Sequence, residues 1–183
     1  MQNTSKKPQM SKEMLLPKLA DYILKNGMGG ASLRPLAKAA GTSDRMLIYH
    51  FGNKEQLITD VLAYIAGIYS AVLDAGMGEE RAATRQQCVA RILAQGREPA
   101  MQPFLVLWWE IVAGSARGVS GYREAGERMM SELLLWLETQ MPVDDPDPVG
   151  GARYLLTIIE GSMMLSAVGH ARTAREGLVA SGL

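Results

Sequence analysis

The stretch SLRPLAKAAGTSDRMLIYHFGNK, residues 32–54, decides the fold. It joins a short segment with apolar residues at helical spacing, a glycine turn at Gly41, a second short segment and a restart after Gly52. Two short helices joined by a tight turn are typical of the helix-turn-helix, whose second helix enters the major groove of DNA. The stretch therefore predicts a DNA-binding element, and the rest of the chain is expected to hold two copies of it apart.

Within this stretch, helices are expected over residues 33–40 and 44–50. Ser32 and Ser43 precede them as candidate N-caps, and Gly41 is expected to end the first helix in the left-handed conformation. Leu47 and Phe51 are expected to face a small core. Four side chains of the second helix are left pointing outward: Asp44, Arg45, Met46 and Tyr49. An arginine on such a face can recognise guanine in the major groove.

Helical periodicity continues on both sides of the motif and predicts an all-α fold of about nine helices. Outside the motif the expected helices cover residues 11–26, 54–76, 80–95, 101–117, 121–141, 152–171 and 174–181. Pro17 predicts that the first helix either starts near Leu16 or is bent, and the proline-rich loop 142–151 cannot continue a helix.

Three parts of the chain are expected. Residues 1–10 are a polar, basic, flexible arm, in which Lys6 and Lys7 either touch phosphate or are simply solvated. Residues 11–53 form the helix-turn-helix domain. Residues 54–183 form a C-terminal regulatory and dimerisation domain, joined to the first by the long helix that begins at Lys54.

Charge is distributed unevenly along the 183 residues. The net charge is zero, but all seven lysines lie at or before Lys54. A basic N-terminal third is expected to meet a polyanion, although chance scatter of solvated charge remains an alternative. The composition, 48% hydrophobic and 21% charged, is that of a soluble globular chain.

Several functional classes find no support in the sequence. Cys88 is the only cysteine, so no intrachain disulfide is possible. No signal peptide or membrane span is expected, which makes the cytoplasm the predicted location. No catalytic motif is present, and Glu110, Glu160 and His170 lack a metal-binding spacing. We expect no enzyme activity, no metal and no cofactor.

The motif residues form the pattern GxSxxxLxYHF followed by KExL, which is built from Gly41, Ser43, Leu47, Tyr49, His50, Phe51, Lys54, Glu55 and Leu57. Over about residues 15–60 this pattern resembles the DNA-binding signature of the tetracycline-repressor (TetR) family. The chain departs from the family pattern at Pro17, Ile23 and Ile48, and Asp44 adds a negative charge to the recognition helix. The resemblance implies a homodimer that binds a palindromic double-stranded DNA operator, with a C-terminal domain that binds a small inducer.

The expected DNA contacts combine the resemblance with the chemistry of each residue: Ser32, Arg34, Thr42, Ser43, Asp44, Arg45, Met46, Tyr49, His50 and Lys54. Arg45 and Met46 are the candidates for base recognition, and Tyr49 is expected to clamp the backbone. Alternatives stay open, since Ser32 and Ser43 could be only caps. His50 could pack against the first helix, and Lys54 could be a solvated first-turn residue.

The C-terminal helices are apolar over more than one face, which predicts both a ligand pocket and a dimer seam of four helices. The candidate ligand-binding residues are Ile68, Met101, Phe104, Leu105, Trp108, Trp109, Tyr154 and Met163. The candidate dimer residues are Met130, Leu134, Leu137, Ile159, Ser162 and Ser166. The adjacent indoles of Trp108 and Trp109 cannot face one core. One of them is expected to line a cavity or the seam, or both are ordinary core residues with one left half exposed. Glu110 is expected to meet a cationic ligand or an arginine.

The favoured hypothesis is a dimeric repressor that a small apolar or aromatic effector releases from its operator. One alternative is a helical ligand-sequestering protein whose DNA-binding element is vestigial. Another keeps DNA binding but has no small ligand, because the pocket is filled by the protein's own side chains. An enzyme on a helical scaffold would need a nucleophile or metal that the sequence does not offer.

Overall fold

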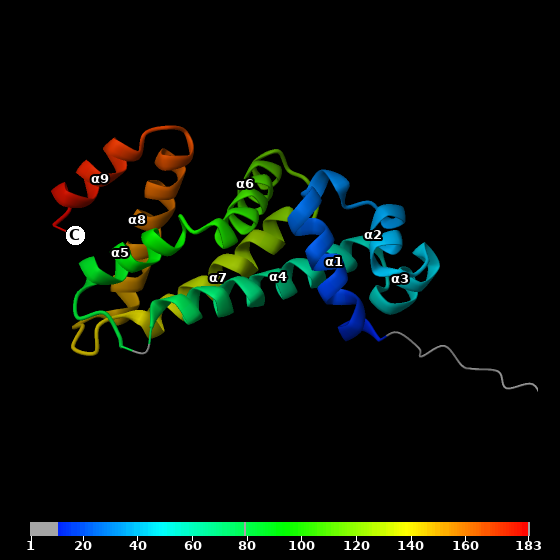
Figure 1. Ribbon diagram of the computed structural model, residues 1–183, viewed down its shortest axis with the longest axis horizontal. Coiled ribbons are helices and arrows are strands. Elements are labelled where there is room, and N and C mark those ends of the chain that lie inside the picture. The colour runs from blue at the N-terminus through cyan, green and yellow to red at the C-terminus, as the bar shows by residue number, and fades with distance from the viewer. Residues whose placement is uncertain (1–10, 79, 183) are drawn as a thin grey trace, which may run out of the picture. The chain divides into compact units, whose positions relative to one another are not determined.

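The computed structural model describes residues 11–78 and 80–182 (Figure 1). The predicted arm, residues 1–10, lies outside the described residues. The described residues form nine α-helices and two short 3-10 helices, without a β-strand. The elements are α1 (Lys12–Asn26), η1 (Met28–Gly30), α2 (Leu33–Ala40), α3 (Asp44–Phe51), α4 (Lys54–Met77), α5 (Arg85–Gln95), η2 (Pro99–Met101), α6 (Gln102–Ala116), α7 (Tyr122–Gln140), α8 (Pro148–Ala167) and α9 (Ala171–Ala180). The predicted all-α class is confirmed.

The chain divides into two compact units. Unit 1 consists of Met1–Ile65 and Val106–Gly126, and unit 2 consists of Ala66–Leu105 and Glu127–Leu183. Helices α4, α6 and α7 each contribute residues to both units. Unit 1 therefore contains the helix-turn-helix together with the first half of α4 and most of α6.

The core of unit 1 is built from aliphatic side chains that recur at helical spacing. Its large, fully buried members are Leu15, Leu19, Ile23, Leu36, Leu47, Leu57, Leu62, Ile65, Leu107 and Ile111. Burial of each such side chain contributes about 1.5–3 kcal/mol relative to its exposure. This packing holds the short helices α2 and α3, which are too short to be stable alone.

The core of unit 2 joins the end of α4 to α5, α7 and α8. Its main cluster includes Met77, Ile92, Leu137, Leu155 and Ile159. The cluster also contains the thiol of Cys88, and burial raises the pKa of that thiol to about 11. Cys88 therefore stays protonated and packs as a small apolar residue.

Helix α1 continues through Pro17, so the alternative start near Leu16 is wrong. Pro17 cannot donate a hydrogen bond to the carbonyl four residues back, that of Glu13, which costs the first turns one bond. The burial of Leu19 and Ile23 in the core offsets this cost. The helix then ends at Gly27, as the sequence predicts.

Helix α5 begins at Arg85 rather than at residue 80. Thr84 is its N-cap, and its hydroxyl accepts a hydrogen bond from the backbone N–H of Gln87 at 3.1 Å. The threonine cap therefore sets the start of the helix.

Helix α8 spans Pro148–Ala167, whereas the sequence predicts residues 152–171. Asp147 caps it by accepting a hydrogen bond from the backbone N–H of Gly150 at 2.9 Å. Proline is favoured in the first turn of a helix, where its missing N–H has no partner to lose. The loop prediction therefore placed Pro148 on the wrong side of the boundary.

Within the described residues, α4 is the one helix long and apolar enough to span a membrane, with a hydropathy of 1.5. Length and composition alone are weak evidence, because the core helix of a soluble protein passes the same test. Leu57, Val61 and Leu62 of α4 are buried in unit 1, and Leu73 is buried in unit 2. These side chains pack in the two cores, and 33% of the apolar window of α4 is buried.

Candidate nucleic-acid interface

The turn between α2 and α3 has the geometry that a helix-turn-helix requires. Gly41 adopts the left-handed conformation, with φ 70° and ψ 34°, which a residue with a side chain rarely occupies. The backbone N–H of Thr42 donates to the carbonyl of Ala37 at 2.9 Å. The Ser43 hydroxyl then accepts from the N–H of Met46 at 3.3 Å and starts α3. The predicted left-handed conformation of Gly41 and the predicted N-cap at Ser43 are confirmed.

Packing of one face of α3 fixes the direction in which its other face points. Leu47 and Phe51 are buried in the core of unit 1. The Lys12 ammonium lies 5.3 Å from the centroid of the Phe51 ring and pairs with Asp60 at 2.5 Å. Lys18 also reaches the Ala40 carbonyl at the end of α2, at 3.4 Å. Helix α3 is thus held against α1 and α4.

The predicted DNA-contacting residues lie on the outside of this three-helix element. Tyr49 is 69% exposed, which is unusual for an aromatic side chain. The other exposed members are Ser32, Arg34, Ser43, Asp44, Arg45 and Lys54. Thr42, Met46 and His50 are half-buried. The structure therefore brings all ten residues to the α2 and α3 element or to the start of α4.

Two helix starts on this element differ in how their first N–H groups are satisfied. Ser32 stands at the N-cap position of α2, but its side chain makes no capping hydrogen bond. At the start of α4, Asn53 accepts from the N–H of Gln56 at 2.7 Å. Ser32 and Lys54, at these two helix starts, are both exposed.

Tyr49 and His50 form an edge-to-face ring pair at the end of α3. Their ring centroids are 5.1 Å apart and the rings are inclined at 81°. The Nε2 atom of His50 is buried and has no hydrogen-bond partner. One nitrogen of the His50 ring therefore faces the protein rather than solvent.

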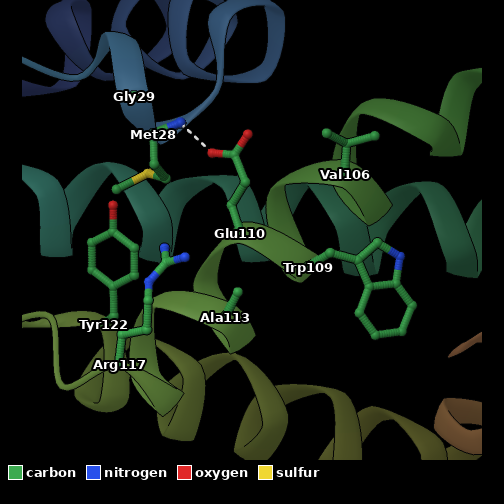
Figure 2. Close-up of a pocket in the computed structure, with 8 residues that line it drawn as sticks. All are labelled: Met28, Gly29, Val106, Trp109, Glu110, Ala113, Arg117 and Tyr122. Atoms are coloured by element: carbon green, nitrogen blue, oxygen red, sulfur yellow. Dashed lines mark hydrogen bonds between the residues drawn. The ribbon is translucent and has the colours of Figure 1, made fainter.

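The cavities differ from the predicted ligand site. Unit 1 contains an open cavity of about 610 Å³. Figure 2 shows its lining residues: Met28, Gly29, Val106, Trp109, Glu110, Ala113, Arg117 and Tyr122. Only Trp109 belongs to the predicted ligand set. Residues 106, 109 and 113 of α6 and residue 117, directly after its end, recur at a helical spacing that the sequence does contain.

Within the described residues, Glu110 of this cavity pairs with a backbone N–H group rather than with an arginine. Its Oε2 atom accepts a hydrogen bond from the backbone N–H of Met28 at 2.6 Å. The bond links α6 to η1 across 82 residues of sequence. Helical spacing alone could not predict this partner, because Met28 lies in a glycine-rich connection.

The second cavity lies inside unit 2 and measures only about 10 Å³, too small for anything beyond one water molecule. It is lined by Tyr69, Ile92, Leu133, Trp136, Leu137, Leu156, Ile159 and Glu160. Burial, and then the charge of Glu160, raise the pKa of Tyr69 to about 12. None of the predicted ligand residues lines this cavity.

The remaining predicted ligand residues are dispersed. Met101 is buried beside Leu73 and Leu133 in the core of unit 2. Tyr154 is exposed. The others are half-buried: Ile68, Phe104, Leu105, Trp108 and Met163. Phe104 packs against Tyr69, with ring centroids 5.6 Å apart.

The predicted dimer residues fall into two groups. Leu137 and Ile159 lie in the core of unit 2, where their own subunit covers them, and Ser162 is buried too. Met130, Leu134 and Ser166 are half-buried or exposed. A seam could therefore involve only the second group directly.

Among residues 11–78 and 80–182, no three His, Cys, Asp or Glu side chains lie close enough to hold a metal ion.

The fold and the exposed face of α3 define a class of protein, the helix-turn-helix DNA-binding regulators.

Comparison with known proteins agrees with this class. Residues 20–61 match the family model described as bacterial regulatory proteins, tetR family. SCO7518 of Streptomyces coelicolor A3(2), assigned as a transcriptional regulator, is 28% identical, with a TM-score of 0.68 over 90% of this chain and 94% of that one. No match was found among curated proteins.

More distant structures share the fold. The transcriptional regulator RHA1_ro04179 from Rhodococcus sp. Rha1 is 20% identical, with a TM-score of 0.64 over 92% of each chain. A TetR transcriptional regulator from Legionella pneumophila is 18% identical, with a TM-score of 0.56 over 97% of this chain and 94% of that one. The chain is a DNA-binding transcriptional regulator that carries the DNA-binding domain of the TetR family.

Proposed function

We propose that the chain acts as a homodimer on a palindromic operator and that a small ligand releases it. The carrying observation is the outward face of α3, where Arg45 and the exposed ring of Tyr49 stand on a helix held rigidly by Leu47 and Phe51. A rigid helix with an exposed arginine and aromatic ring suits the major groove.

The proposed roles follow from position on the element. Arg45 and Met46 contact base edges, while Asp44 accepts from a cytosine amino group or orients Arg45. Arg34 on α2 reaches a further base edge. The remaining proposed contacts hold the DNA backbone: Ser32, Thr42, Ser43, Tyr49, His50 and Lys54.

A dimer is supported by exposed apolar side chains on the helices that the sequence assigns to the seam. Leu135 of α7, Met164 of α8 and Val168, which directly follows α8, are all more than half exposed in the single chain. Exposed apolar side chains that gather in a patch commonly mark a protein interface. Two-fold symmetry would match the two halves of a palindromic operator.

The test begins with a selection of bound fragments from genomic DNA, followed by footprinting of the enriched sequence. We expect a palindrome with two protected half-sites. Arg45→Ala and Tyr49→Ala should each weaken binding at least tenfold while the circular dichroism spectrum is unchanged. Arg175→Ala, a change at an exposed arginine of α9, serves as the matched control.

The alternatives give different results in the same experiment. A ligand-sequestering protein with a vestigial DNA-binding element would show no enriched palindrome and no steep loss of DNA affinity with salt. A regulator without an effector would bind the palindrome, but no compound in a thermal-shift screen would raise its melting temperature.

A further inference from the structure

The cavity of unit 1 is a groove along one face of α6. Val106, Trp109, Ala113 and Arg117 recur every three or four residues, so they span about 16 Å at 1.5 Å per residue. Figure 2 shows Val106 and Trp109 at one end and Arg117 beside Tyr122 at the other. A volume of about 610 Å³ is within the usual range of small-molecule sites.

The two ends of the groove differ in chemistry. Val106, Trp109 and Ala113 offer an apolar wall, and the Met28 side chain adds a polarizable thioether. The opposite end carries the exposed guanidinium of Arg117, for which no ion pair is present within the described part of the chain. The groove is therefore amphipathic along its length.

Tyr122 adds a neutral donor to the polar end. Burial, and then the charge of Glu110, raise the pKa of its hydroxyl, so the O–H stays protonated at neutral pH. Its ring lies against Gly114, where an added Cβ would come within 2.0 Å of the ring carbon Cδ2. The absence of a side chain at Gly114 thus leaves room for the Tyr122 ring at the Arg117 end.

The carboxylate of Glu110, the acidic residue of the groove, already accepts a hydrogen bond within the protein. Glu110 accepts the N–H of Met28 at 2.6 Å, and its Oε1 atom lies 2.5 Å from where a Cβ of Gly27 would stand. Charge-assisted hydrogen bonds of this length are among the strong ones. The carboxylate therefore faces η1, and Arg117 is the charge left for a ligand.

We propose that this groove binds a slender amphipathic anion, whose apolar body lies along Val106 to Ala113 and whose carboxylate meets Arg117 and Tyr122. Its role as the effector site rests on the proposed function. Because Glu110 and Met28 lie in the same groove, an occupant changes the contact between α6 and the helix-turn-helix element and weakens DNA binding.

The probe is decanoate, titrated into the full-length protein by calorimetry, with decylamine and decan-1-ol as matched compounds of the same chain length. We expect decanoate to bind about tenfold more tightly than decan-1-ol, and decylamine to bind more weakly than either. Tighter binding of decylamine would place the dominant charge at Glu110 and overturn the proposal.

Substitutions in the groove test whether decanoate binds there. Arg117→Gln should weaken decanoate binding about tenfold and leave decan-1-ol binding unchanged, and Ala113→Trp should fill the groove and abolish both. Arg123→Gln, a change at an exposed arginine of α7 that does not line the groove, is the matched control. Equal losses in Arg117→Gln and Arg123→Gln, or wild-type binding by Ala113→Trp, would overturn the assignment.

A DNA titration separates this inference from the proposed function. Saturating decanoate should raise the Kd for the selected operator at least tenfold in the wild type and have no effect in Ala113→Trp. If the protein binds no DNA, the proposed function is contradicted, and calorimetry still tests whether decanoate binds in the groove. A protein that binds both DNA and decanoate independently contradicts the effector role.

Discussion

At the scale of single residues, Ser32 and Ser43 both stand at the start of a helix, but only one of them forms a capping hydrogen bond. Ser43 accepts the N–H of Met46, whereas Ser32 makes no capping bond. We expect Ser43→Ala to lower the free energy of unfolding by about 1 kcal/mol, and Ser32→Ala to leave it unchanged. Ser32→Ala should instead weaken binding of the operator, because it removes a phosphate contact.

Urea unfolding and DNA titration of both variants provide the measurements. A loss of stability in Ser32→Ala equal to that in Ser43→Ala would identify Ser32 as a cap in solution. An unchanged DNA affinity in Ser32→Ala would contradict its proposed phosphate contact.

Gly27 is the residue on which the link between α6 and η1 depends. Its φ of 70° and ψ of 179° lie in a region that essentially only glycine occupies. A Cβ there would also meet the Glu110 carboxylate at 2.5 Å. We expect Gly27→Ala to lower the free energy of unfolding by about 1–3 kcal/mol. Gly29→Ala, where an added Cβ meets nothing within 4 Å, should change it little.

A double-mutant cycle separates the two contributions at Gly27. If the carboxylate collision matters, Gly27→Ala costs less free energy in a Glu110→Ala background than in the wild type. Strict additivity in urea unfolding would show that the backbone conformation alone is responsible.

At the scale of elements, an ion pair fastens the loop before α8 to α5. The Arg85 guanidinium donates to both carboxylate oxygens of Asp145, at 2.6 and 2.7 Å, and to the Asp147 carbonyl at 3.1 Å. We expect Arg85→Gln to lower the free energy of unfolding by about 2 kcal/mol at pH 7. Arg172→Gln, which breaks the exposed pair with Glu176, should cost under about 0.5 kcal/mol.

The same pair predicts a dependence on pH. The hydrogen bonds from Arg85, followed by a backbone bond at Asp147 and the Arg85 charge, hold the pKa of Asp145 below its ordinary value of 3.8. Its contribution is therefore fully present above about pH 5 and is lost as the pH falls through the lowered pKa. The stability gap between wild type and Arg85→Gln should shrink below about pH 4 in urea unfolding. A gap that stays constant down to pH 2 would contradict the pair.

The sequence predicted most elements because their boundaries rest on local chemistry. Gly41, Ser43 and the spacing of Leu47 and Phe51 are enough to fix α2, α3 and their inward faces. It failed at α8, where Pro148 could either break a helix or begin one. Only the cap formed by Asp147 and Gly150 decides between them.

The cavity of unit 1 contains residues that the helical periodicity of the sequence could not bring together. The apolar face of α6 was apparent, but the residues that complete the groove come from η1 and from the start of α7. Met28 and Glu110 are 82 residues apart, and no periodicity links them. Tertiary contacts of this kind depend on how helices pack, so the sequence alone could not indicate which residues line this cavity.

At the scale of the whole molecule, dimerisation decides whether two copies of α3 can bind one operator. Met164 of α8 is 51% exposed in the single chain, so Met164→Lys leaves the subunit fold intact. If α8 forms the seam, the buried ammonium prevents association. We expect light scattering to give twice the 19.9 kDa of one chain for the wild type and a single-chain mass for Met164→Lys. DNA affinity should fall by about 10²-fold or more, because the second half-site no longer binds intramolecularly.

Val179→Lys on α9 is the matched control, since Val179 is 78% exposed and lies outside the predicted seam. It should remain a dimer with wild-type DNA affinity. The reverse result, a dimeric Met164→Lys and a monomeric Val179→Lys, would move the interface from α8 to α9. A wild type that is monomeric at micromolar concentration and still protects two half-sites would place assembly on the DNA, so that the operator itself brings the two copies together.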